Sequence, residues 1–194
     1  MRDFDSDEEK YMSWYLDELK KAGYINSFIF HPEAYVLSDS FFYEYDKCLK
    51  IKKKKIIVQE FVEEHIYSAD FLVIWNECAR GIFFNTFDDR INVKKIPFVA
   101  NNNDAPYSVI EVKADFSKYN MIRVFSLNQR WVMQRFGVYV QKAIVSNKTG
   151  IFKTTFTPNK FLLCDKIVKL RKLHYKPRTL AKFVVDYGKN SYYT

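Results

Sequence analysis

The sequence predicts a mixed α/β fold in which a central β-sheet is flanked by helices. Two short apolar runs, residues 71–75 and 109–113, have the length and the β-branched content of strands. Amphipathic helical patterns precede and follow them, at about residues 6–22 and 120–136. The chain has 194 residues, of which 48% are apolar and 18% aromatic, so we expect one domain with a buried core.

The overall charge narrows the class of partner. A net charge of +8 and a pI near 9.2 favour an anionic partner, most simply nucleic acid. The three cysteines form neither a zinc spacing nor a disulfide framework, which is typical of a reducing compartment such as the cytoplasm. The start of the chain is acidic and amphipathic, unlike a signal peptide, and no apolar run approaches the roughly 20 residues that cross a bilayer. We therefore expect no membrane partner.

The first predicted helix covers residues 6–22. Ser6 is a suitable N-cap, Glu9 follows at the capping-box spacing, and Gly23 ends the helix. Glu9 has two interpretations: it is either the partner of the N-cap or a member of a functional site. In the second interpretation Glu8 is the less favoured substitute.

An extended segment and a basic block follow the helix. Pro32 holds its predecessor His31 extended, and we expect His31 to be structural because no other histidine stands at a ligand spacing from it. Residues 50–55 are rich in lysine and run into a predicted strand. This block is either a phosphate-binding edge, with Lys52 and Lys53 as contacts, or a charged edge strand that discourages pairing between sheets.

Charged side chains stand at the ends of the two apolar strands. Asp70 opens strand 71–75, whose continuous apolar run is typical of a central, buried strand. Charged and apolar residues alternate in 109–113, so Glu111 and Lys113 share one face of their strand. If the strands are neighbours, Asp70 and Glu111 lie side by side, and two carboxylates at that separation repel unless a cation lies between them. Hard oxygen ligands with open water positions favour Mg²⁺ or Mn²⁺.

The segment between these strands is a predicted insertion at about residues 77–106. Residues 81–99 have the pattern of a β-hairpin with a polar turn, and residues 101–106 have the composition of a loop. Two roles remain open for the hairpin, since it can extend the sheet or reach over a substrate.

A second helix and further elements follow the acid-X-Lys strand. The helical pattern of residues 120–136 places Gln129 and Arg130 among its polar positions. Residues 138–142 and 150–156 then predict a closing pair of strands that completes a mixed sheet.

The C-terminal residues 158–194 are strongly basic, with aromatic side chains interleaved. Residues 159–173 predict a short helix with a cationic face. One interpretation is DNA contact, because cationic side chains give sequence-independent affinity for phosphates that falls steeply with salt. The other is a solubilising face on a loose tail. The candidate contacts are Lys169, Arg171, Lys172, Lys176 and Arg178.

The two strand ends resemble the active-site pattern of the PD-(D/E)XK nuclease superfamily. In that pattern an Asp precedes one strand and an acid-X-Lys follows on the next. Here Ala69-Asp70 stands where Pro-Asp is usual, and Glu111-Val112-Lys113 fills the second element.

The first helix is similar to that of small phage-type members, which often begin with Phe-Asp-Ser-X-X-Glu. Phe4, Asp5, Ser6 and Glu9 match this pattern in place, and the segment from His31 to Leu37 is similar to their Gln-Pro-X-Phe-X-Leu. The resemblance implies a restriction-endonuclease-like core in residues 1–157, with the basic C-terminal extension 158–194 packed on it or trailing it.

The resemblance also implies an activity, that of a Mg²⁺-dependent endonuclease that hydrolyses phosphodiester bonds in DNA and leaves 5′-phosphates. Lys113 would orient the attacking water or stabilise charge on the phosphate. Gln129 would orient water or phosphate, its alternative being ordinary helix surface. The implied metal ligands are Asp70, Glu111, the Val112 carbonyl and Glu9.

The substrate implied by the compact phage-type members is branched or junction DNA, processed in phage DNA metabolism. Resolution of a junction would need a homodimer, so that two sites cut two strands, and the sequence identifies no dimer face. A site-specific restriction-type enzyme is a second option. A third is a non-catalytic nucleic-acid-binding or virion-associated protein on a nuclease fold. The intact Asp70, Glu111 and Lys113 argue against the third option.

Overall fold

The computed structural model describes residues 4–48, 54–89, 96–115, 119–164 and 167–190. The chain forms two compact units. Unit 1 consists of Met1–Pro32 with Ala69–Thr194, and unit 2 is the inserted segment Glu33–Ser68.

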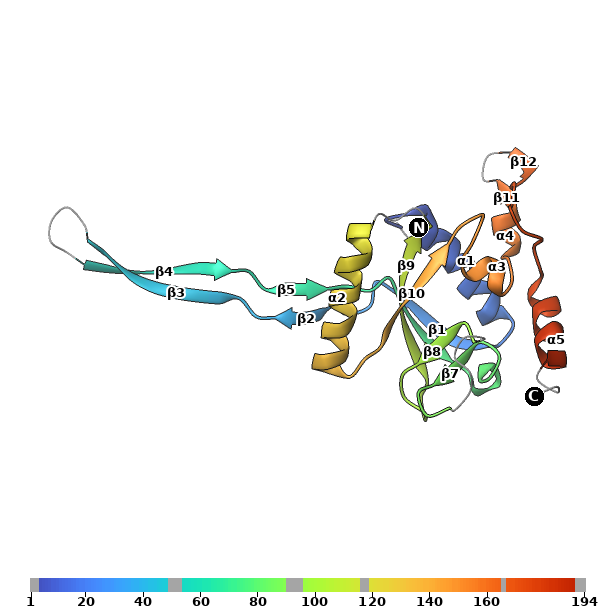
Figure 1. Cartoon of the computed structure of the whole chain (residues 1–194), viewed down its shortest axis with the longest axis horizontal. Coiled ribbons are helices and arrows are strands. Elements are labelled where there is room, and N and C mark those ends of the chain that lie inside the picture. Colours follow the sequence, from blue (N-terminus) through green and yellow to red (C-terminus); the bar gives the residue numbers. More distant parts are fainter. Residues whose placement is uncertain (1–3, 49–53, 90–95, 116–118, 165–166, 191–194) are drawn as a thin grey trace. The chain divides into compact units, whose positions relative to one another are not determined.

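Unit 1 is built on a mixed four-stranded sheet with the strand order β1-β6-β9-β10 (Figure 1). Strand β6 pairs antiparallel with both β1 and β9, whereas β10 runs parallel to β9. Two long helices accompany this sheet, which confirms the predicted mixed α/β class with a helix-flanked sheet. The elements are α1 (Asp7–Lys21), β1 (Ile25–Phe30), β6 (Phe71–Trp75), β9 (Tyr107–Ala114), α2 (Tyr119–Phe136) and β10 (Val140–Val145).

Helix α1 begins and ends as its sequence predicts. The Ser6 hydroxyl accepts a hydrogen bond from the Glu9 amide at 3.2 Å, which satisfies a backbone donor of the first turn. Gly23 follows the last turn with φ of 80°, a left-handed conformation that glycine adopts without a Cβ clash. The start of α1 is therefore fixed, and with it the position of Glu9.

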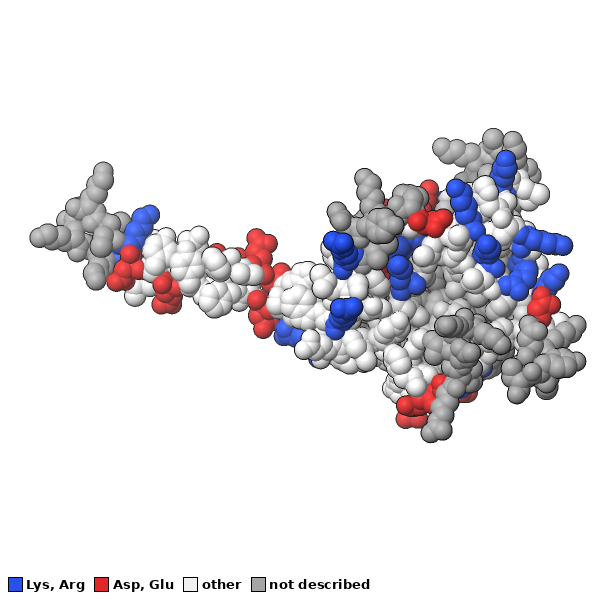
Figure 2. Space-filling view, in the orientation of Figure 1, with Lys and Arg blue, Asp and Glu red and all other residues white. Residues whose placement is uncertain are grey.

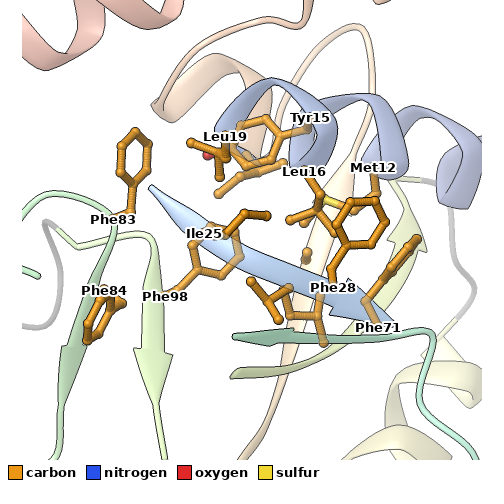
Figure 3. Packing of buried hydrophobic residues seen from close by; sticks show 14 of the residues in the cluster. Met12, Tyr15, Leu16, Leu19, Ile25, Phe28, Phe71, Phe83, Phe84 and Phe98 are labelled. Carbon is orange, nitrogen blue, oxygen red and sulfur yellow. The ribbon is translucent and has the colours of Figure 1, made fainter. Parts of the chain in front are cut away.

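The hydrophobic core lies between α1 and one face of the sheet. The buried side of α1 packs over β1, β9 and β10, with aromatic rings filling much of the space (Figure 3). Tyr15 is fully buried; its ring stacks on Phe156 at 4.3 Å and its hydroxyl hydrogen-bonds Thr155. Burying a large side chain of this kind contributes about 1.5–3 kcal/mol, so α1 is held firmly against the strands that carry the candidate site.

The predicted hairpin in residues 81–99 is wrong. Strands β7 (Phe84–Thr86) and β8 (Phe98–Ala100) pair parallel, after a short 3₁₀ helix at Glu77–Ala79. The Asp89 carboxylate accepts hydrogen bonds from the amide and hydroxyl of Thr86, so the chain turns directly after β7 instead of continuing into a hairpin arm. The buried rings of Phe84 and Phe98 join the core, so this segment packs into unit 1.

The predicted strand at residues 150–156 is also wrong. Its start is the helical turn α3 (Ile151–Thr154), which buries Ile151 and Phe152. Gly150 has φ of 91°, and a Cβ there would lie 2.0 Å from the Ile144 carbonyl oxygen, so a close approach to β10 fixes the turn. A short apolar run fits a helical turn as well as a strand. The helical turn forms here, and it buries both Ile151 and Phe152.

The predicted helix over residues 159–173 shortens to one turn. Helix α4 (Asn159–Leu162) gives way to a strand pair, β11 (Leu163–Cys164) with β12 (Ile167–Leu170), and helix α5 (Leu180–Asn190) follows. The β-branched pair Ile167-Val168 favours the strand. Phe161 and Phe183 are buried in the core cluster, so the C-terminal segment belongs to unit 1 as a packed element.

Unit 2 is a pair of two-stranded antiparallel ladders. Strand β2 (Tyr35–Ser38) pairs with β5 (His65–Tyr67), and β3 (Phe41–Cys48) pairs with β4 (Lys54–Val62). The sequence predicts strands at the start of β2 and within β4, but not β3 or the ribbon that the four strands form. Lys52 and Lys53 lie outside the described residues.

No helix in the described part of the chain is long and apolar enough to cross a membrane.

Candidate metal and phosphate site

Backbone hydrogen bonds bring three distant segments together at one end of the sheet. The Asp70 amide donates to the Ile110 carbonyl at 3.1 Å, and the His31 amide donates to the Asp70 carbonyl at 2.9 Å. These bonds extend the antiparallel pairing of β1, β6 and β9 by one step beyond Phe71, which pairs with Ile110. The end of β1, the start of β6 and the acid-X-Lys of β9 are therefore neighbours, as the sequence predicts for the last two.

The Asp70 carboxylate is held against β9. Its Oδ2 accepts a hydrogen bond from the Val112 amide at 2.6 Å. Burial, followed by the neighbouring Glu111 carboxylate, raises the pKa of Asp70 to about 7, with a smaller contribution from Glu9. The Val112 hydrogen bond and the Lys113 ammonium act in the opposite direction without cancelling the effect. The raised pKa reflects first the burial of the carboxyl group and second its acidic neighbours, and a bound cation would favour the ionised form.

Glu111 and Lys113 form an ion pair on the same face of β9. The Lys113 Nζ lies 2.6 Å from Glu111 Oε1, as expected for residues two apart on a strand. Both side chains are largely buried, with 21% of Lys113 and 11% of Glu111 exposed. On the next strand, Lys142 is the register partner of Glu111. The ammonium of Lys113 is therefore fixed beside the carboxylates.

Glu9 reaches this sheet end from the first turn of α1. Its Oε1 accepts from the Ser6 hydroxyl at 2.8 Å and its Oε2 from the Asp5 amide at 3.1 Å, and the residue is 7% exposed. The capping interpretation of Glu9 is therefore confirmed, and the same contacts orient a buried carboxylate that interacts with Asp70. Membership of Glu9 in a functional site stays a prediction. Glu8 instead lines a separate hollow of about 430 Å³.

Asp5 and His31 are the residues that the sequence analysis missed. Ligand atoms of Asp5, Glu9 and His31 all lie within 4.8 Å of one another. His31 Nε2 is 3.6 Å from Asp5 Oδ2 and 4.0 Å from Glu9 Oε2. The expectation that Pro32 holds His31 extended is wrong, because the His31 backbone has φ of 49°, a left-handed value that is uncommon for a residue with a side chain. The sequence contains Asp5 in the Phe-Asp-Ser pattern, but no feature of the sequence places Asp5 next to His31.

Other predicted site residues lie farther along the sheet. The Gln129 amide donates to the Val140 carbonyl at 2.5 Å, which ties α2 to the start of β10, two residues before Lys142. Gln129 and Lys142 line a hollow of about 470 Å³ between these elements. The Val112 side chain is buried in the core, and its amide is the group that binds Asp70. Its carbonyl as a ligand stays a prediction.

The predicted DNA contacts fall into two groups. Arg171 lies over the rings of Tyr11 and Phe161 and donates to the Phe161 carbonyl, and Arg178 donates to the Thr154 carbonyl. The contacts of these two guanidinium groups therefore stabilise the packing of the C-terminal segment. The exposed candidates are Arg130, Lys172 and Lys176, and the side chain of Lys169 lies outside the described residues. Figure 2 shows lysines and arginines gathered over the C-terminal elements of unit 1.

The donor chemistry of the sheet end fits a hard divalent cation. Among the described residues, the ligand atoms that all lie within 4.8 Å of one another belong to Asp5, Glu9 and His31. The carboxylates of Asp70 and Glu111 lie outside that group, although both Glu111 and Glu9 act electrostatically on Asp70, and Lys113 supplies one fixed positive charge. Carboxylate oxygens are the ligands that Mg²⁺ and Mn²⁺ prefer. Binding of a cation by these carboxylates stays a prediction.

Comparison with known proteins finds no matching family model, no matching curated protein and no matching solved structure.

Proposed function

We propose that the chain is a metal-dependent endodeoxyribonuclease with a restriction-endonuclease-like core. The observation that carries the proposal is the convergence of Asp70, Glu111 and Lys113 at one sheet end, with Glu9 arriving from α1. The helix-flanked mixed sheet and the order of these residues agree with the PD-(D/E)XK resemblance in the sequence. The net charge of +8 supports a polyanionic substrate.

Asp70, Glu111 and Glu9 would hold Mg²⁺, or Mn²⁺ in its place, together with the Val112 carbonyl. A cation bound there supplies Lewis-acid chemistry: it polarises the scissile phosphate and lowers the pKa of a coordinated water. The chain positions its ligands before binding, because Asp70 is fixed by the Val112 amide and Glu9 by Ser6 and the Asp5 amide.

Lys113 would stabilise the negative charge that develops on the phosphate oxygens. Its ammonium is held 2.6 Å from Glu111, so it needs little reorganisation when charge appears. A positioned cation performs this role without losing its proton. Hydrolysis would leave a 5′-phosphate and a 3′-hydroxyl, and branched or junction DNA is the substrate class we propose.

The test is a paired substitution of lysines. Lys113→Ala should lower the rate of duplex cleavage in Mg²⁺ by about 100- to 1,000-fold, the usual effect of removing one charge-stabilising donor. Lys20→Ala, at the exposed C-terminal end of α1, removes the same charge away from the site and should cut at the wild-type rate.

DNA affinity, measured in Ca²⁺ to suppress cleavage, separates catalysis from binding. Lys113→Ala should retain near-wild-type affinity. Equal cleavage rates for the two variants would show that Lys113 has no catalytic role. DNA binding without any cleavage by the wild type would instead favour a binding protein on a nuclease fold.

A further inference from the structure

The ribbon formed by β3 and β4 carries a row of four aromatic rings on one face. Tyr43 and Tyr45 are stacked at 5.6 Å, Tyr43 meets Phe61 at 5.9 Å, and Phe61 meets Phe41 at 6.4 Å. We name these four residues the aromatic face. The row is contiguous along the ribbon because residues two apart on a strand point the same way.

The aromatic face is exposed. Its solvent-exposed fractions are 59% for Phe41, 38% for Tyr43, 39% for Tyr45 and 71% for Phe61. Among the described residues, neither β3 nor β4 pairs with a third strand. A two-stranded ribbon is marginally stable in water, and contiguous exposed apolar patches mark interaction sites. A partner that covers the rings would therefore stabilise the ribbon itself.

The opposite face of the ribbon differs in charge. There Glu44 lies opposite Val58, Asp46 opposite Ile56, and Glu60 opposite Phe42. Acidic and apolar residues thus alternate across the two strands on this side. On the aromatic face the register places Tyr45 opposite Ile57, Tyr43 opposite Gln59 and Lys47 opposite Lys55, with no acidic residue.

Charge also changes along the length of the ribbon. Lys47 and Lys55 stand at the turn end of the aromatic face, whereas Glu63 and Glu64 follow its other end in the sequence. Residues 33–68 contain six lysines and seven acidic residues, a net charge of −1. Since the whole chain has +8, the remaining residues carry 8 − (−1) = +9.

We propose that the aromatic face is a dimer interface that binds the same face of a second copy of this chain, with the two ribbons antiparallel. In that orientation the lysine end of each ribbon meets the acidic end of the other, and the rings of both copies become buried between two ribbons. A parallel arrangement would bring the lysine ends together and cost repulsion. A two-fold axis makes both ends of the interface equivalent.

DNA is a poorer occupant for this surface. The net positive charge of the chain lies outside residues 33–68, whose six lysines are outnumbered by seven acidic residues, and acidic residues line the opposite face of the ribbon. A ribbon lying in a groove of DNA has phosphates on both sides, so Glu44, Asp46 and Glu60 would be repelled. The second copy matches both the apolar surface and the charge order.

Sedimentation of the full-length protein over a wide concentration range tests the interface. The wild type should form a dimer. Phe61→Glu places a charge on the aromatic face and should raise the dissociation constant at least about tenfold, which is about 1.4 kcal/mol. Val58→Glu is the matched control, since it places the same charge at an exposed position on the opposite face, and it should dimerise as the wild type does.

Charge reversal tests the antiparallel orientation. Chains with Lys47→Glu and Lys55→Glu should dimerise poorly, and so should chains with Glu63→Lys and Glu64→Lys. An equimolar mixture of the two should recover dimers, because each ribbon end then meets the opposite charge. A mixture that stays monomeric while the wild type dimerises would overturn the antiparallel orientation.

The remaining outcomes are equally decisive. A wild type that stays monomeric overturns the inference, and so does a dimer that Phe61→Glu leaves intact. If the wild type is monomeric and Phe61→Glu binds DNA more weakly than the wild type does, DNA is the occupant of the aromatic face and the dimer is overturned. The inference does not rest on the nuclease proposal, since Lys113→Ala should dimerise normally, and a dimer without cleavage leaves it standing.

Discussion

At the residue scale, Asp70 is the carboxylate of the candidate site whose pKa is clearly raised in the folded protein. Its pKa is raised from 3.8 to about 7, first by burial and then by Glu111. The protonated form is thus favoured in the folded state. Its contribution to the free energy of unfolding is fully present below the ordinary pKa and is lost as the pH rises through about 7.

The Asp70→Asn variant should therefore be more stable than the metal-free wild type at about pH 8, by roughly 1–3 kcal/mol. The uncharged amide keeps an oxygen for the Val112 hydrogen bond. Denaturant unfolding in EDTA measures the difference, which should disappear at about pH 4. Mg²⁺ should then stabilise the wild type and not the variant, because a ligand stabilises the state that binds it.

The control is Asp104→Asn, an exposed carboxylate in the loop before β9. It should leave stability unchanged at both pH values. A wild type that is as stable as Asp70→Asn in EDTA at about pH 8 would contradict the raised pKa of Asp70.

Some residues of the site were predictable from local spacing and others were not. The period of a strand placed Glu111 and Lys113 on one face, and the apolar run after Asp70 predicted a buried neighbour. Asp5 and His31 meet only because α1 and the end of β1 fold to the same place. A single sequence gives no distance between such segments, so the expectation that His31 is purely structural lacked this contact.

At the scale of elements, the first turn of α1 links stability with the site. The Ser6 hydroxyl caps the helix and also donates to Glu9. Ser6→Ala should lower the free energy of unfolding by about 1 kcal/mol and also reduce cleavage, because the Glu9 carboxylate loses a partner. Ser6→Thr keeps the hydroxyl and should preserve both properties. Normal cleavage by a destabilised Ser6→Ala would separate Glu9 from the site.

The C-terminal elements offer a prediction about DNA affinity. Lys172 and Lys176 are exposed, and replacing both with Ala should weaken binding and reduce the slope of log affinity against log salt by about two. The matched control is Lys20→Ala with Lys21→Ala at the exposed end of α1. An unchanged slope would assign the C-terminal charge to solubility alone. Substitution is preferable to truncation, because Phe161 and Phe183 belong to the core.

Long periodic elements were predictable, whereas short ones depended on tertiary contacts. Helices α1 and α2 and strands β6 and β9 follow their sequence patterns closely. The turn α3 replaced a predicted strand because its apolar residues pack beside α1, and β7 and β8 pair parallel instead of forming a hairpin. In each case a short apolar run fits two structures, and burial decides between them.

At the scale of the whole molecule, the sequence predicts one core with a basic extension that is packed on it or trails it. The structure separates Glu33–Ser68 as its own unit, and the C-terminal segment packs within unit 1. Strand β3 was not predicted, although the apolar and charged residues of its second half alternate with the period of a strand. In a dimer formed through the aromatic face, the ribbon of the second copy would cover the exposed aromatic rings of β3.

The measurement that most directly tests the nuclease proposal is cleavage of four DNA forms by the purified full-length protein. Linear duplex, single strand, flap and four-way junction DNA are offered side by side in Mg²⁺, Mn²⁺ or EDTA, with Lys113→Ala in parallel. We expect cutting that requires the metal, favours branched DNA, leaves 5′-phosphates and is lost in Lys113→Ala. Absence of cleavage of every form in both metals, or cleavage that persists in EDTA, would contradict the proposal.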